Sequence, residues 1–303
     1  MTSSVLRVGS GASELAMAYA AQAAARLGAH ELVGIADEPE SPGVLVGRLR
    51  EALLRGDVDA VVHAASELPR VPADGIELVA MPKRADARDA LCSADGARLV
   101  ALAPGARVGT GSARRRAQLL ATRPDLDIVA IGGDIATRLD LLTAPEADRR
   151  LDAVVLAAAG LDRLGRGEDA VERFGLSDWP ASPAQGALAI EVRAGAPAGL
   201  LRRIAAIDHR PTRLAARAEL AVLAHLEADA TAPIGAYAQL EDGLLFLTAT
   251  VYAPDGTDSI TASHAAYPED VRDPADALGE RVAGELLERG AGDLAPGSRG
   301  GAS

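Results

Sequence analysis

Short apolar runs alternate with helical segments over the first two thirds of the chain. Residues 4–9 (SVLRVG), 31–35 (ELVGI) and 59–65 (DAVVHAA) predict strands, because apolar runs of this length between polar turns are typical of buried strands. Residues 13–30 and 44–57, which separate these runs, predict helices, and the first helix is expected to end near Gly28. Strands that alternate with helices indicate a parallel α/β layer.

The alternation continues in a second unit. Strands are predicted at residues 106–112 (ARVGTGS), 127–133 (DIVAIGG) and 152–160 (DAVVLAAAG), and a helical run follows each of them. Residues 182–195 then predict a returning strand. The pattern therefore favours two α/β units in succession.

Arginines follow the ends of the three strands in the second unit. Arg114 and Arg115 follow the first, Arg138 the second and Arg163 the third. In open α/β sheets, ligands bind at the carboxyl ends of the strands, and helix N-termini favour anions. Ser112 is expected to cap the first of these helices. The sequence therefore predicts an anion site at one sheet edge, where a negatively charged ligand offsets the repulsion between the cations.

The last third of the chain has a different pattern. Residues 200–228 predict helices, and residues 232–267 alternate apolar and polar positions around turns at 241–243 and 254–256. Such alternation is typical of an antiparallel meander. Residues 274–290 predict a closing amphipathic helix, so this region is expected to form a smaller α+β unit.

Composition narrows the class of ligand. The 303 residues carry a net charge of −12 and only 2% aromatic residues, which disfavours nucleic acid and anionic membranes as partners. No apolar run is long enough to span a bilayer and no signal sequence is apparent, so we expect a cytoplasmic protein. We also expect a monomer. The five histidines lack metal-ligand spacing, and no metal is expected. The single cysteine, Cys92, is interpreted as a small buried apolar residue.

Several segments resemble the porphobilinogen deaminase family, also called hydroxymethylbilane synthase, of tetrapyrrole and haem biosynthesis. The resemblance rests on LRVGSGASELAM, DAVVHAASELP, RADARDAL, VGTGSARRRAQL, RPDLDIVAIGGDIATRLDLL, LDAVVLAAAGLDRLG, SPAQGALAIEVR and LEADATAPIGAYAQL. It implies two α/β domains like the halves of a periplasmic binding protein, with a cleft between them, and a smaller C-terminal α+β domain. We expect domain 1 at 1–82 with 183–200, domain 2 at 88–176 and domain 3 at 205–290. Residues 291–303 are predicted to form a disordered tail.

The resemblance also implies the chemistry. The family joins porphobilinogen units head to tail on a dipyrromethane primer held as a thioether to a cysteine. Every pyrrole ring carries an acetate and a propionate, and arginine forks bind carboxylates well. The positions that match the carboxylate binders of the family are Ser13, Thr110, Ser112, Arg114, Arg115, Arg138 and Arg163. Arg116 is interpreted as a solvated helix residue.

Other positions depart from the family pattern. Glu67 stands where the resemblance implies a catalytic aspartate, and its extra methylene displaces the carboxylate. The position implied to anchor the primer is Ala230, which cannot form a thioether. Gly11 and Gly132 replace arginines that face the incoming substrate, and Ser66 replaces a lysine.

Residues 36–43 replace a longer loop that covers the cleft in the family. Losing this cover is expected to leave the site wetter.

Two functions stay open. The first is a catalytically impaired relative that binds a pyrrole or tetrapyrrole carboxylate in the cleft, with no covalently bound cofactor; a protein partner is a variant of this hypothesis. The second is an active hydroxymethylbilane synthase with a non-covalently held primer and Glu67 as the catalytic carboxylate. A solute-binding protein with the same two-lobed architecture would require export, which the N-terminal sequence does not support.

Overall fold

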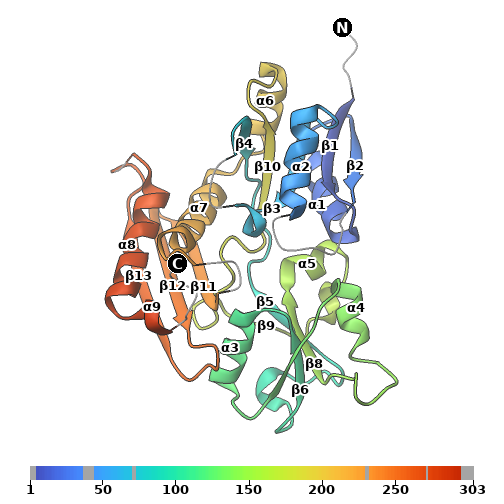
Figure 1. Cartoon of the computed structure of the whole chain (residues 1–303), viewed down its shortest axis with the longest axis vertical. Coiled ribbons are helices and arrows are strands. Elements are labelled where there is room, and N and C mark those ends of the chain that lie inside the picture. The colour runs from blue at the N-terminus through green and yellow to red at the C-terminus, as the bar shows by residue number, and fades with distance from the viewer. Residues whose placement is uncertain (1–4, 37–43, 70–72, 229–231, 271, 295–303) are drawn as a thin grey trace, which may run out of the picture.

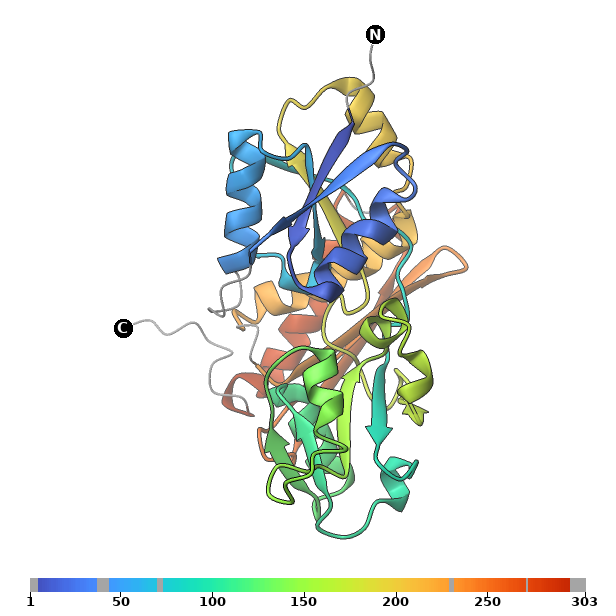
Figure 2. The same ribbon diagram turned by 90° about the vertical axis from the view of Figure 1, so that its right-hand side faces the viewer.

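The computed structural model of the protein describes residues 5–36, 44–69, 73–228, 232–270 and 272–294. The described chain forms two five-stranded sheets and one three-stranded sheet, each packed against helices (Figure 1). The first two sheets lie toward opposite ends of the molecule, and the C-terminal unit lies beside both (Figure 2). This is the predicted fold class of two α/β units and a smaller α+β unit.

The first sheet has the strand order β2-β1-β3-β10-β4. Its strands are β1 (Leu6–Gly11), β2 (His30–Ile35), β3 (Ala60–Ala64), β4 (Ile76–Ala80) and β10 (Leu188–Arg193), and its helices are α1 (Glu14–Ala24), α2 (Val44–Arg55) and α6 (Ala198–Ala205). β1 is parallel to β2 and β3, whereas β10 is antiparallel to β3 and β4. Fully buried Val8 and Ile190 belong to its core, so the returning strand completes the first unit.

The second sheet has the order β7-β6-β8-β5-β9. Its strands are β5 (Asp89–Ser93), β6 (Arg107–Thr110), β7 (Asp127–Ala130), β8 (Ala153–Ala157) and β9 (Glu172–Arg173), and its helices are α3 (Ala113–Thr122), α4 (Ile135–Asp140) and α5 (Ala158–Arg163). β6 is parallel to both β7 and β8. The carboxyl ends of these three strands therefore lie at one edge, as predicted.

The C-terminal unit is an antiparallel meander covered by helices. It comprises β11 (Ile234–Glu241), β12 (Leu244–Tyr252), β13 (Ser259–Ala266), α7 (Arg210–His225), α8 (Pro274–Glu288) and α9 (Ala291–Leu294). The first turn uses Asp242 and Gly243, both with positive φ, which suits a tight hairpin. Val222, Leu247 and Val282 are fully buried between the sheet and the helices.

Residues 291–294 correct the predicted disordered tail. They form α9, and Ala291 is packed into the core of the C-terminal unit with 1% exposure. The apolar contact stabilises one more helical turn than the polar composition of this segment predicts. Residues 295–303 lie outside the described part of the chain.

Short 3-10 turns complete the described fold at η1 (Ala65–Glu67), η2 (Leu99–Ala101) and η3 (Gly167–Asp169). Turn η1 continues directly from the carboxyl end of β3. It therefore places Glu67 just beyond the end of a central strand of the first sheet.

Candidate functional site

Arg114 and Arg115 lie in the first turn of α3, and Asp89 on β5 pairs with both. Arg114 Nη1 is 2.7 Å from one carboxylate oxygen and Arg115 Nε is 2.9 Å from the other. Trp179 and Gln185 also donate hydrogen bonds to this carboxylate. The charge of Asp89 therefore offsets the repulsion between these two arginines, for which the sequence alone predicts a negatively charged ligand.

The electrostatics of this cluster follow from its burial. Asp89 has no exposure, and burial alone would raise the pKa of its carboxyl, but the two guanidinium groups outweigh this and hold that pKa well below its usual range. Burial lowers the pKa of Arg115. Arg114 Nε is buried without a hydrogen-bond partner among the described residues. A ligand-binding role for these two arginines stays a prediction.

Thr110, Ser112 and Ser13 form local hydrogen bonds at strand and helix ends. Ser112 Oγ accepts from Arg115 N at 3.4 Å, so Ser112 is the N-cap of α3, as predicted. The Thr110 hydroxyl accepts from Ser112 N at 3.2 Å. Ser13 caps α1 by accepting from Ala16 N at 3.3 Å. These contacts fix the turns from which any ligand contacts would come.

Arg138 lies on α4, after the carboxyl end of β7. Its Nε donates to the carbonyl oxygen of Gly133 at 2.8 Å, and no carboxylate in the described part of the chain lies within ion-pair distance of it. The side chain is half-buried, and burial lowers the pKa of its guanidinium. Arg138 is therefore a partly desolvated cation with no carboxylate within ion-pair distance among the described residues, although the charge of Asp134, at the N-cap of α4, acts on it.

Arg163, at the end of α5, reaches from the second unit to the first. Its Nε donates to Gln22 Oε1 at 2.8 Å and its Nη2 to the carbonyl oxygen of Gly186 at 2.9 Å. The guanidinium carbon lies 4.9 Å from the centre of the Tyr19 ring, a cation–π contact. All of these partners are uncharged, and burial lowers the pKa of Arg163.

Glu67 lies in the same region as Arg163. Burial raises the pKa of Tyr19 to about 12; the charge of Arg163 lowers it and that of Glu67 raises it. Glu67 is exposed, at the end of η1. The charges of an acid from the first unit and a guanidinium from the second therefore both act on Tyr19.

The remaining sequence predictions have different outcomes. Cys92 is buried in β5 with 1% exposure, which confirms its interpretation as a core residue. Arg116 is exposed, as expected. Gly132 is exposed, and a Cβ built on it meets no atom within 4 Å, so nothing in the fold requires glycine there. Ala230 and most of the shortened loop, residues 37–43, lie outside the described residues.

Sequence reasoning missed two residues of this region. Asp89 lies within RADARDAL, a segment that carried the family resemblance without a role for its acids. Tyr19 lies in an Ala-rich helix. Aromatic residues are rare in this chain, and that rarity is the sequence feature that singles out Tyr19. Both matter because they set the surroundings of the arginines.

Within the described ranges, no group of three or more His, Cys, Asp or Glu residues could hold a metal ion. None of the described helices is both long and apolar enough to cross a membrane.

The comparisons with known proteins agree with the sequence pattern. Residues 6–199 match the family model described as the dipyromethane cofactor binding domain of porphobilinogen deaminase, and residues 213–288 match its C-terminal domain. A porphobilinogen deaminase of Leifsonia xyli is 55% identical over 262 residues, covering 84% of this chain and 78% of the relative. One from Acidothermus cellulolyticus is 42% identical over 312 residues, covering 96% and 91%.

A solved periplasmic binding protein of an arginine transport system from Legionella pneumophila overlaps this chain with a TM-score of 0.32. It is 13% identical and the match covers 67% of this chain and 91% of that one. The fold assignment rests on the strand orders given above, and the family assignment rests on the two domain models and the curated relatives. This chain belongs to the porphobilinogen deaminase family.

Proposed function

We propose that this protein binds a pyrrole or tetrapyrrole polycarboxylate non-covalently where domains 1 and 2 face each other, and that its turnover of porphobilinogen is impaired. The observation that carries the proposal is that two arginines at this sheet edge form no ion pair with a carboxylate of the described chain. Arg138 and Arg163 are half-buried, and neither forms an ion pair with a carboxylate among the described residues, although the charges of Asp134 and Asp162 act on them from further away. Partly desolvated cations of this kind favour an anionic ligand.

The ligand class follows from the number and spacing of the cations. Arg138 comes after the end of β7, and Arg163 comes after the end of β8. These two strands flank β6 in the sheet, so both arginines follow strand ends at the same sheet edge. A ligand that carries several carboxylates can engage both guanidinium groups, and Arg side chains bind carboxylates through two parallel hydrogen bonds. Ser13, Thr110 and Ser112 would supply hydroxyl groups at neighbouring turns. Arg114 and Arg115 would support this edge through Asp89.

A thioether-bound dipyrromethane does not fit the residues present. The chain has one cysteine, and Cys92 is buried inside domain 2, where burial raises the pKa of its thiol to about 12. A protonated, inaccessible thiol is a poor nucleophile. Ala230, at the matching position of the family, cannot form the bond. The proposed site therefore holds its ligand without a covalent bond.

Impairment is proposed on chemical grounds. Glu67 holds the position of the catalytic aspartate with a longer side chain, and displacing a catalytic group by about an ångström costs on the order of a hundredfold in rate. Gly11 and Gly132 remove two positive charges from the side of the incoming substrate. Each change weakens stabilisation of the transition state rather than the fold.

An active hydroxymethylbilane synthase is the second candidate, and one observation favours it. Glu67 lies at the end of β3, close enough to Tyr19 to raise its pKa, and Arg163 contacts the same ring. The charge of the Glu67 carboxylate and the guanidinium of Arg163 therefore both act on the Tyr19 ring. Catalysis there would use a non-covalently held primer and Glu67 to stabilise the cation left when ammonia departs.

Binding is tested by calorimetric titration of the purified protein with uroporphyrin, a porphyrin with acetate and propionate side chains. Replacing both Arg138 and Arg163 with glutamine is expected to abolish binding. Replacing Arg202, an exposed arginine of α6 in the first unit, with glutamine removes one charge away from this sheet edge and is expected to leave binding unchanged. No heat from the wild-type protein, or equal binding by the double variant, would overturn the proposal.

Turnover is measured as porphobilinogen consumption with product analysis, in the wild-type protein and in Glu67→Gln. Negligible consumption by folded wild-type protein supports impairment. Consumption that Glu67→Gln abolishes supports the active synthase instead, with Glu67 as its catalytic carboxylate.

A further inference from the structure

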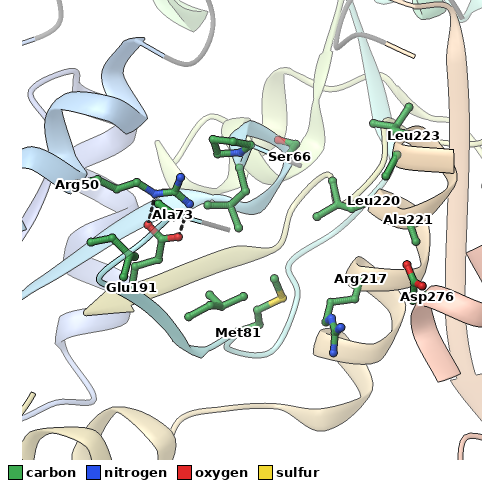
Figure 3. Close-up of a pocket in the computed structure, with 15 residues that line it drawn as sticks. Arg50, Ser66, Ala73, Met81, Glu191, Arg217, Leu220, Ala221, Leu223 and Asp276 are labelled. Atoms are coloured by element: carbon green, nitrogen blue, oxygen red, sulfur yellow. Dashed lines mark hydrogen bonds and ion pairs between the residues drawn. The ribbon is translucent and has the colours of Figure 1, made fainter. Parts of the chain in front are cut away.

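A cavity of about 330 Å³ lies between domains 1 and 3. Its domain 1 wall comes from β4 and from the segment on either side of Glu67, and its domain 3 wall comes from α7 and the start of α8 (Figure 3). The larger apolar residues of the lining include Leu68, Ile76, Leu78, Met81, Leu220 and Leu223. This volume and lining are typical of a site for a small molecule with an apolar body.

Charged residues stand at opposite sides of the cavity, with Arg50 and Glu191 on one side, Arg217 and Asp276 on the other and Met81 between them (Figure 3). On one side Arg50 donates to both oxygens of Glu191, at 2.6 and 2.9 Å, and His63 also contacts Glu191 at 3.1 Å. These charges therefore satisfy each other. A ligand gains little by competing with a two-point ion pair.

The other side has an excess of negative charge. Arg217 pairs with Asp273, which does not line the cavity, at 2.6 Å. Asp276 lines the cavity with 56% of its side chain exposed, so it stands at the solvent side, and its Oδ1 contacts His225 Nε2 at 3.1 Å. Asp273 and Asp276 together outweigh Arg217. A cationic head group is favoured here over an anionic one.

We propose that this cavity binds a small amphipathic amine, with its apolar body against Met81 and the leucines and its ammonium group on Asp276. The site is separate from the arginines of the proposed polycarboxylate site, so it does not depend on that function. Ser66, Leu68 and Pro69 line it and bracket Glu67 in sequence. An occupant therefore contacts the segment that holds Glu67.

The chain offers a direct reporter for this site. Its three methionines are Met1, Met17 and Met81. Met81 lines the cavity with no solvent exposure, whereas Met17 lies on α1, where its sulfur faces Gly34. Protein labelled with ¹³C at the methionine methyls is titrated with hexylamine, hexanoate and hexan-1-ol. We expect a saturable shift of the Met81 signal with hexylamine, weaker effects with the other two, and no change at Met17.

Two matched pairs of variants test the location. Asp276→Asn is expected to weaken hexylamine binding about tenfold, as removal of one charged hydrogen bond does, whereas Glu280→Gln, which removes a charge from the same helix outside the cavity, leaves it unchanged. Ala224→Phe fills the mouth of the cavity and is expected to abolish the shift, whereas Ala205→Phe at an exposed position of α6 does not. Hexanoate binding as tightly as hexylamine, equal shifts at Met17, or insensitivity to Asp276→Asn would overturn the proposal.

Discussion

Asp89 shows how much a single carboxylate contributes to this molecule. It is fully buried and faces Arg114 and Arg115, so removing its charge leaves two buried guanidinium groups uncompensated. We expect Asp89→Asn to lower the free energy of unfolding by about 3–5 kcal/mol, measured by urea denaturation near neutral pH. The exposed pair of Arg55 and Asp57 is the control, and Asp57→Asn should cost less than about 1 kcal/mol. Equal effects of the two variants would contradict this role for Asp89.

Glu191 gives a pH dependence with a definite sign. Burial alone would raise the pKa of its carboxyl, but hydrogen bonds from Arg50 and His63 outweigh burial and lower it from 4.5 to about 2. The folded pKa lies below the unfolded one, so its contribution is fully present above about pH 5 and is lost as the pH falls toward 2. That contribution is roughly 3 kcal/mol.

The test compares urea denaturation of the wild-type protein and Glu191→Gln from pH 6 to pH 3. The gap in unfolding free energy between them should narrow steadily below about pH 5. Glu51→Gln removes an exposed carboxylate from neighbouring α2 and should follow the wild-type curve. Parallel curves for the wild type and Glu191→Gln would show that Glu191 carries no such linkage.

Gly132 allows a gain-of-function test of the polycarboxylate site. It lies one residue before Gly133, whose carbonyl oxygen accepts from Arg138, and a Cβ there meets no atom within 4 Å. Gly132→Arg should therefore fold normally and tighten uroporphyrin binding about tenfold by adding one charge-assisted hydrogen bond. Gly199→Arg adds the same charge at an exposed position of α6 that is equally open. Similar tightening by both variants would mean that net charge, and not a local site, attracts the ligand.

At the scale of elements, local pattern predicts most of the fold. Continuous apolar runs predict β3 and β8. Asp242 and Gly243 predict the first hairpin turn, and Ser112 predicts the start of α3. Each of these signals lies within a few neighbouring residues. Chain order then places the carboxyl ends of β6, β7 and β8 together, because strands joined by helical crossovers pair in parallel.

Elements fixed by distant partners could not be predicted in the same way. β5 begins at a charged residue, Asp89, and becomes a strand through antiparallel pairing with β8. The predicted first helix ends near Gly28, whereas α1 ends at Ala24. For the candidate site, sequence finds the arginines but not their partners, since Asp89 and Tyr19 reach Arg115 and Arg163 only in the folded chain. Which arginines are neutralised internally is therefore a property of tertiary structure.

At the scale of the whole molecule, Glu219 on α7 joins the three domains. Its carboxylate accepts two hydrogen bonds from Arg84, in the first connection between domains 1 and 2, at 2.6 and 3.0 Å. It also accepts from Ala184 N, in the return connection, at 2.6 Å and from Ala238 N, on β11, at 2.7 Å. Glu219 is fully buried, so one domain 3 carboxylate holds both connections between the other two domains. This arrangement predicts that the domains unfold together.

Glu219→Gln is expected to uncouple that unfolding. A neutral amide cannot accept all four bonds, and Arg84 is left buried without its charged partner, so domain 3 loses its attachment to the two connections. Urea unfolding is followed by circular dichroism and by fluorescence of Trp179, the only tryptophan, which is buried against Phe174 near Asp89. Coincident transitions are expected for the wild type and for Glu285→Gln, a partly exposed position of α8, whereas Glu219→Gln should give separate midpoints for the two signals. If the two signals still coincide in Glu219→Gln, the cooperativity of the molecule rests on the apolar interfaces between the domains and not on this carboxylate.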